Sequence, residues 1–121
     1  MALLSFAEMM AQQLQRQGSM GNLVQIPLAL TAASGETTLV AAVAGRRIVI
    51  EALELVPAAA LTFAVWSGTV GAGTRITGDV VGNAGAQYQW WDRITHADNV
   101  ILNLNRATSV AMSGSLVYRL L

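Results

Sequence analysis

The sequence predicts an all-β protein: an antiparallel sandwich of about eight short strands, of jelly-roll type, preceded by a short N-terminal helix. After Leu23 the apolar residues alternate with polar ones in short runs, which is typical of strands. Gly, Asn, Ser and Pro separate these runs at the close spacing of a sandwich or barrel. No helical crossover interrupts them, and eight strands without crossovers favour two antiparallel sheets.

Length and composition indicate one domain that assembles with others. The chain has 121 residues, enough for a core of its own, and no cysteine, which excludes disulfides and thiolate metal sites. Hydrophobic residues make up 54% of the chain, above the roughly 45–50% of ordinary soluble domains. This excess predicts extra buried surface of the kind that an obligate oligomer provides.

Charge and hydropathy argue against several classes of partner. Seven acidic residues balance seven arginines, so the chain lacks the basic surface expected of a protein that binds nucleic acid or an anionic membrane. The most apolar window, residues 48–66, contains Glu51, Glu54 and Pro57, whereas a spanning helix needs about 20 apolar residues. A secretory signal is not expected, because the N-terminus has no basic region. We expect the protein to stay in the cytoplasm of the cell that makes it until it is assembled.

Residues 3–17 contain the one substantial helix that the sequence predicts. Ser5 and Glu8 have the spacing of a capping box, in which the Ser5 hydroxyl accepts a hydrogen bond from the Glu8 backbone N–H. Phe6, Met10 and Leu14 recur at helical spacing before the chain reaches a glycine at residue 18. A helix of about a dozen residues is marginal alone, so it needs a surface on which to dock.

Two interpretations of this helix remain open: it packs on its own domain, or it anchors the protein to a partner. Residues 1–21 are predicted to be a helical arm with a glycine-flanked joint at residues 18–21, and residues 22–121 to be the sandwich domain. The anchoring hypothesis assigns capsid attachment, argued below, to four apolar side chains of the arm: Phe6, Met9, Met10 and Leu14.

The eight predicted strands follow one another through short turns. Pro27 suggests that the first is an edge strand, because proline cannot donate to a sheet ladder. In the seventh strand Leu102 and Leu104 share one face. In the eighth strand one face carries the apolar residues Val110, Met112, Leu116, Tyr118 and Leu120. By residue range the strands are 24–30, 37–43, 45–56, 61–66, 74–81, 87–91, 100–105 and 108–121.

The third of these strands, at residues 45–56, is expected to lie in the centre of a sheet, because both of its faces are mostly apolar. Strict alternation groups Ile48 with Ile50 and Ala52 on one face. The opposite face then carries Val49, Leu53 and Leu55. The strand is therefore expected to be covered on both sides, by a second sheet or by another subunit. The predicted subunit interface consists of Val49, Leu53, Leu55 and Trp90.

No motif predicts catalysis, and the chain is expected not to be an enzyme. Asp92, His96 and Asp98 could ligate a metal, but their spacing matches no strong motif and no fourth ligand stands out. His96 is the only histidine, so a Ser-His-Asp triad would need it, and no serine lies in a nucleophile-elbow sequence. We expect a polar loop here, with no metal and no cofactor.

Two further segments have both a binding and a structural interpretation. The loop at residues 68–73 superficially resembles a phosphate loop, but the residues after it alternate like a strand instead of opening a helix. Trp90 and Trp91 could stack on a sugar, although adjacent strand residues point to opposite faces, so at most one faces outward. The structural interpretation places these tryptophans in the core or in a subunit interface.

Three segments of the predicted domain combine into a recognisable pattern of strands and turns: LVAAVAGRRIVI at residues 39–50, LNLNRATSV at residues 102–110 and GSLVY at residues 114–118. Together they resemble a recurrent group of small virion proteins of tailed bacteriophages. The likeness covers residues 36–121, roughly 70% of the chain. It implies a jelly-roll-like subunit, commonly trimeric, that decorates or cements a capsid or forms a short head fibre. The group has no catalytic residues to carry over.

From this resemblance we expect a structural virion protein that binds the capsid surface as a homotrimer and stabilises the shell. Its partners would be other copies of itself and the major capsid protein, with neither nucleic acid nor membrane. The alternative is a head-fibre or tail protein that recognises a host glycan. Either protein would be assembled in the host cytoplasm, and the first would end on the capsid surface.

Overall fold

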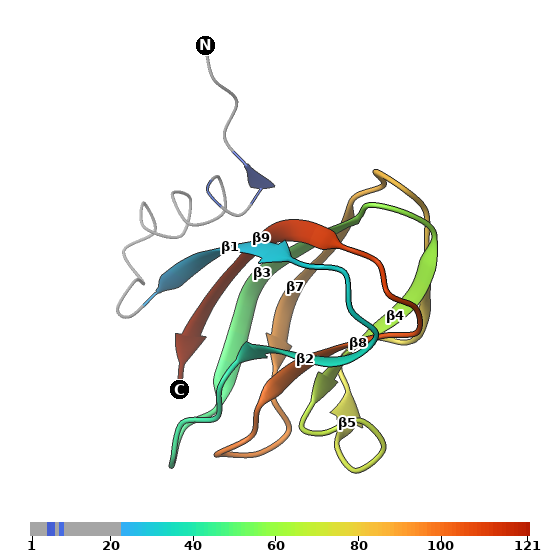
Figure 1. The fold of residues 1–121 in the computed structure, drawn as a ribbon. Helices are drawn as coiled ribbons and strands as arrows, with labels where there is room; N and C mark the ends of the chain where they lie inside the picture. Colours follow the sequence, from blue (N-terminus) through green and yellow to red (C-terminus); the bar gives the residue numbers. More distant parts are fainter. Residues whose placement is uncertain (1–4, 7, 9–22) are drawn as a thin grey trace.

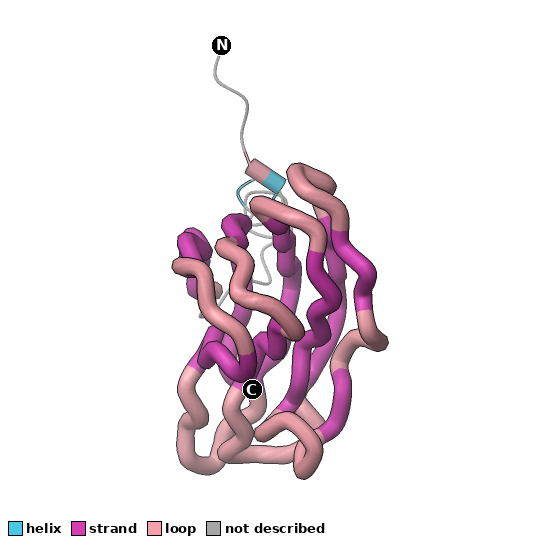
Figure 2. The backbone as a smooth tube through the Cα atoms, turned by 45° about the vertical axis from the view of Figure 1, so that its right-hand side comes forward, coloured by secondary structure: helices cyan, strands magenta, loops and turns pink. Residues whose placement is uncertain are grey.

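The computed structural model describes residues 5, 6, 8 and 23–121, and this part of the chain is all-β, as predicted. Nine antiparallel strands form two sheets that face each other, with turns at both ends of the layers (Figure 1, Figure 2). The strands are β1 (Val24–Leu30), β2 (Gly35–Val40), β3 (Ile48–Pro57), β4 (Leu61–Ser67), β5 (Thr74–Arg75), β6 (Val80–Gly82), β7 (Tyr88–Ile94), β8 (Leu102–Arg106) and β9 (Met112–Leu120).

The strands pair in a nested order. Sheet A has the order β1-β9-β3-β7, and sheet B has the order β2-β8-β4-β5, with β6 also paired to β4. The first strand therefore pairs with the last, β2 with β8, β3 with β7, and β4 with β5 and β6. Because β1 lies at the edge of sheet A, Pro27 occupies the edge position that the sequence predicts.

Every predicted strand except the first differs from the observed strand in its bounds, and one of them is divided in two. The predicted strand at residues 74–81 is instead two short strands, because Thr77 interrupts it: the Thr77 hydroxyl accepts a hydrogen bond from the Val65 backbone N–H at 3.1 Å. In a regular strand pair a backbone carbonyl would accept the Val65 N–H, and here the Thr77 hydroxyl takes its place. The predicted strand at residues 37–43 begins earlier, at Gly35, and ends at Val40.

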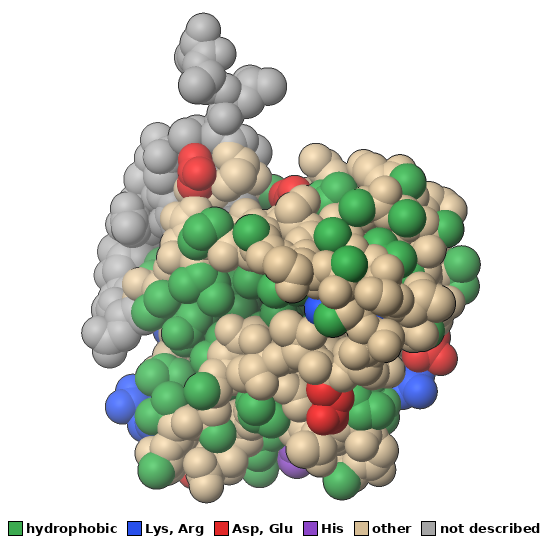
Figure 3. Space-filling model, in the orientation of Figure 1, with side chains coloured by type: hydrophobic (Ala, Val, Ile, Leu, Met, Phe, Trp, Pro, Cys, Tyr) green, Lys and Arg blue, Asp and Glu red, His purple; other side chains and the backbone are tan. Residues whose placement is uncertain are grey.

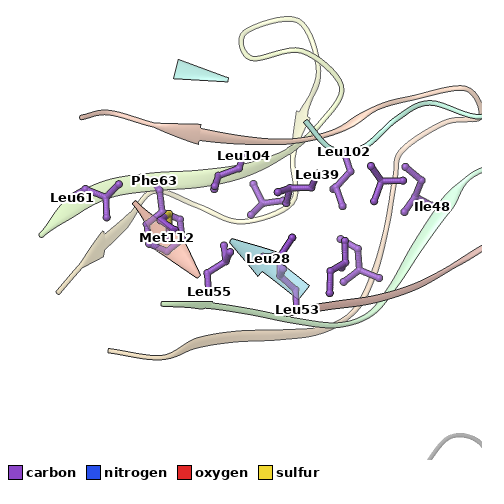
Figure 4. Close-up of a cluster of buried hydrophobic side chains, with 14 residues drawn as sticks. Leu28, Leu39, Ile48, Leu53, Leu55, Leu61, Phe63, Leu102, Leu104 and Met112 are labelled. Carbon is purple, nitrogen blue, oxygen red and sulfur yellow. The ribbon is translucent and has the colours of Figure 1, made fainter. Parts of the chain in front are cut away.

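The core fills the space between the inner faces of the two sheets (Figure 4). Its largest fully buried side chain, Phe63, meets the rings of Tyr88 and Trp90 edge to face, with ring centroids 5.6 and 6.1 Å apart. Fully burying one such side chain stabilises the fold by roughly 1.5–3 kcal/mol. The labelled members from sheet A are Leu28, Ile48, Leu53, Leu55 and Met112, and those from sheet B are Leu39, Leu61, Phe63, Leu102 and Leu104.

Strand β3 contains a bulge at Glu51. The register with β9 steps from Ile50 opposite Tyr118 to Ala52 opposite Val117, so Glu51 has no partner residue on β9. One extra residue in a strand shifts the alternation of all the residues that follow.

The bulge overturns the predicted division of the faces of β3. Leu53 and Leu55 point to the inner face and join the core, in which each is 0% exposed. Ala52 lies on the outer face of sheet A, where its neighbours across the sheet are Val117 and Trp91. Sheet B covers the inner face of the strand, as predicted, whereas Phe6 and Leu23 of the same chain pack on the outer face at Ala52. The residues on each face differ from the prediction beyond Ile50.

Little of the predicted arm lies among the described residues. The Glu8 backbone N–H donates to the Ser5 hydroxyl at 3.1 Å, as the capping box predicts, and the backbone at Phe6 and Glu8 is helical. The rest of the predicted helix, with Met9, Met10 and Leu14, lies outside the described residues, and so does the predicted joint at residues 18–21.

Candidate interaction surface

The predicted subunit-interface residues do not form one surface. Assigning Leu53 and Leu55 to an interface is wrong, because both are completely buried in the core of their own chain. Trp90 is half-buried and packs against the same core, next to Phe63. Only Val49 lies on the outer face of sheet A, and it is 8% exposed. The physical reason is the bulge in β3, which period-two reasoning cannot detect.

Of the four predicted attachment residues, the structure describes only Phe6. It is half-buried and packs on the outer face of sheet A, against Ala52 and Val117. Its ring also meets Trp91 edge to face, with the centroids 4.9 Å apart. These contacts favour the interpretation in which the segment docks on its own domain.

The three predicted metal-ligand candidates have separate roles. Asp98 forms an ion pair with Arg47 at 3.6 Å, and Asp92 sits in β7 opposite the bulge with a φ of 54°. His96 instead contacts Ser67 of β4, which is 29 residues away in the chain. Among residues 5, 6, 8 and 23–121 no group of three or more metal-ligating side chains is found.

Ser67 and His96 form a contact that sequence reasoning missed. The Ser67 hydroxyl lies 2.6 Å from His96 Nδ1 and accepts a hydrogen bond from the His96 backbone N–H at 2.9 Å. Ser67 is 1% exposed, so a substrate cannot reach its oxygen from outside. The pair therefore fastens the loop after β7 to the end of β4 and is not arranged for nucleophilic attack. No local signal could have revealed it, because Ser67 ends a strand of sheet B and His96 follows a strand of sheet A, so the two residues meet only through the packing of the two sheets.

The glycine loop at residues 68–73 is not arranged as an anion site. The Glu36 carboxylate accepts the Val70 backbone N–H, so a negative charge already lies where a phosphate would bind. Inside the loop, the Thr69 carbonyl accepts from the Gly73 N–H at 2.7 Å. A hollow of about 270 Å³ lies beside the loop and His96, and its lining contains no arginine.

The two adjacent tryptophans point to opposite faces, as predicted. Trp90 faces the core, while Trp91 lies on the outer face of sheet A and is 38% exposed. Because Phe6 packs against the Trp91 ring, this ring is not a free platform for a sugar.

An exposed apolar surface lies on the side of the sandwich between β1 and β2, which are edge strands of sheet A and of sheet B. In Figure 3 hydrophobic side chains gather over this side of the molecule. Val24 is 38% exposed, Val43 37% and Leu121 57%. Four half-buried side chains connect these residues to the core: Ile26, Leu30, Tyr118 and Leu120. We call these seven residues the open edge.

Hydrogen bonds of Arg46 and Arg47 fix the end of the open edge that contains Val43 and Leu121. The Leu121 carbonyl accepts from the Arg47 N–H at 3.1 Å, and the Leu121 N–H donates to the Arg47 carbonyl at 2.9 Å. The Arg46 guanidinium donates to the Leu120 carbonyl at 3.3 Å, and the Arg46 N–H donates to the Val43 carbonyl at 3.1 Å. These bonds therefore hold the C-terminus next to the turn after β2.

An apolar hollow of about 560 Å³ adjoins the other end of the open edge at Leu30. Val56, Pro57 and Met112 form part of its wall, and no charged residue lines it. Thr31 also lines the hollow and is fixed by Arg106, whose Nη1 donates to the Thr31 carbonyl at 2.8 Å. The apolar surface thus continues from the C-terminus to the hollow.

In the part of the chain that the structure describes, no helix is long and apolar enough to cross a membrane. Comparison of the chain with known protein families, curated proteins and solved structures finds no match.

Proposed function

We propose that the two-sheet fold is a jelly roll. A jelly roll arises when one long antiparallel hairpin wraps into two sheets and forms two Greek keys. The nested pairing supports this assignment, because β1 pairs with β9, β2 with β8, β3 with β7, and β4 with β5 and β6. Consecutive strands β1 to β4 also alternate between the two sheets.

We further propose that the protein is a structural virion protein of a tailed bacteriophage. It decorates or cements the capsid, associates with copies of itself, most simply as a trimer, and contacts the major capsid protein. The open edge is the observation that carries this proposal. An apolar surface that joins the core through Ile26, Leu30 and Tyr118 is characteristic of a protein that buries it in an assembly. The resemblance of residues 36–121 to small phage virion proteins is the reason for proposing that this assembly is a phage capsid.

Side-chain packing, and not strand addition, is the proposed mode of association. Pro27 lies in the middle of edge strand β1 and has no N–H to offer to an added strand. Val24, Val43 and Leu121 are exposed, so another copy can cover their side chains without extending sheet A.

A non-enzymatic role fits the same arrangement. Ser67 is buried, Asp98 pairs with Arg47, and Glu36 accepts a loop N–H, so these candidate groups are engaged in contacts within the chain. The alternative of a fibre or tail protein that recognises a glycan would need an exposed aromatic platform. The contact between Phe6 and Trp91 favours the decoration role over this alternative.

Phage particles that lack this protein provide the test. The full chain, added to particles of the phage that encodes it, is expected to co-sediment with them and to raise the temperature at which the shell opens, because binding stabilises the bound state. Val24→Asp should abolish this effect, whereas Val81→Asp should retain it. Val81 is 77% exposed in β6, which pairs with β4 on the side away from β8 and β2.

Two results would contradict the decoration role. Co-sedimentation with isolated tails or fibres alone would favour the alternative. No binding to any part of the particle would show that the virion role is wrong.

A further inference from the structure

The outer face of sheet A contains a small apolar site built from three neighbouring strands. Ala52 of β3 lies opposite Val117 of β9 on one side and opposite Trp91 of β7 on the other. Ala52 and Val117 are 0% exposed, although they are on the face that points away from the core. Something therefore covers them from outside the sandwich.

Two described residues from the start of the chain pack on these side chains. Phe6 and Leu23 both contact the cluster formed by Ala52 and Val117. The Phe6 ring also meets the Trp91 ring at a centroid distance of 4.9 Å and an interplanar angle of 75°. This edge-to-face geometry is the one that aromatic pairs prefer. We call Leu23, Ala52, Trp91 and Val117 the Phe6 site.

The site is suited to an aromatic ring in both size and chemistry. Ala52 is the smallest side chain of the row, so it leaves room above the sheet for the Phe6 ring. The Glu51 carboxylate and the Arg119 guanidinium form an ion pair at 2.5 Å on the same face and so neutralise each other beside the apolar surface. The Ser5 hydroxyl holds the Glu8 N–H and thereby fixes the backbone turn that carries Phe6.

We propose that the Phe6 site is the docking site of the N-terminal segment of the same chain, with Phe6 as its anchoring side chain. Leu23 lies immediately before β1 and packs on the same site. Phe6 and Leu23 of the one chain therefore both lie on the outer face of sheet A. Docking of this kind is a property of the single chain and does not rest on the proposed virion role. It covers Ala52 and Val117 with Phe6 and leaves the open edge for other subunits.

Quenching of tryptophan fluorescence by acrylamide in the full-length protein tests the docking. The component of the signal that disappears in Trp91→Phe belongs to Trp91. Phe6→Ala should raise the quenching of this component and shift its emission to the red, because the Trp91 ring loses its cover. Phe6→Tyr, which keeps a ring in the site, should behave like the wild type. Unchanged quenching in Phe6→Ala would overturn the proposal.

A mixing experiment identifies the chain that supplies the ring. Phe6→Ala has an intact site without the ring, and Trp91→Ala has the ring with an incomplete site. If docking occurs within one chain, Trp91 in the Phe6→Ala protein stays equally accessible after the two variants are equilibrated together. Restored protection of Trp91 in the mixture would show exchange between copies and would overturn docking within the chain. Phe6→Ala is also expected to leave the association state unchanged, so this test and the test of the virion role can fail separately.

Discussion

Arg106 shows how one residue can fix several loops of a sandwich. Its side chain is 2% exposed, and burial lowers the pKa of its guanidinium below the ordinary value of arginine. Nη1 donates to the Thr31 and Val110 carbonyls at 2.8 and 2.9 Å, and Nη2 donates to the Thr37 hydroxyl at 2.8 Å. The charged group thus satisfies backbone oxygens from the β1–β2 and β8–β9 connections, which no sequence motif indicates.

Replacing Arg106 by methionine is expected to lower the free energy of unfolding by about 2–3 kcal/mol, because buried oxygens lose a charged donor. Urea unfolding measures this loss. Arg75→Met is the matched control: Arg75 is exposed, pairs with Asp79 at 2.8 Å and lies over the Trp66 ring. It should cost less than about 1 kcal/mol, because exposed ion pairs contribute little. Equal losses in the two variants would show that the Arg106 hydrogen bonds do not stabilise the fold.

At the scale of the element, β3 separates what a sequence pattern can predict from what it cannot. Its β-branched residues and apolar faces predicted a central strand, and it lies between β9 and β7. The assignment of Leu53 and Leu55 to an outer face failed, because the bulge at Glu51 shifts the alternation. Strand β9 has no such irregularity, and its predicted apolar face, which includes Met112 and Leu116, lies in the core as expected.

The corrected position of Leu53 gives a prediction that differs from an interface role. Leu53→Ala should lower the free energy of unfolding by about 2–5 kcal/mol, because it leaves a cavity in the core. The loss relative to the wild type, measured by thermal or urea unfolding, should be the same at every protein concentration. Val81→Ala, at an exposed position, is the control and should have little effect. A variant that unfolds like the wild type but associates more weakly would restore Leu53 to a subunit interface.

At the scale of the whole molecule, the sequence predicted the class of fold but not the surface. Alternation is a local property, so it predicted strands and turns over most of residues 23–121. The order in which strands pair is not local, and it decides that β1 and β2 become edges with an apolar opening between them. The packing of one sheet on the other is not local either, so the contact of Ser67 at the end of β4 with His96 after β7 could not be predicted from the chain. The turn residue Thr77 was missed because a side chain can replace a ladder partner without any change in the apolar pattern.

The open edge also accounts for the composition of the chain. A hydrophobic fraction of 54% exceeds what one small core requires, and part of the excess lies at Val24, Val43 and Leu121. A protein with this surface gains stability when another copy covers it.

Sedimentation velocity of the full-length protein tests this central claim most directly, with three variants run beside the wild type. The wild type should sediment as an oligomer, and Val24→Asp and Val43→Asp should shift it to monomer, because each places a charge in an apolar contact. Val81→Asp, which adds the same charge at an exposed valine away from the open edge, should sediment like the wild type. A wild-type protein that remains a folded monomer at high micromolar concentration would contradict the claim, as would an oligomer that neither open-edge variant weakens.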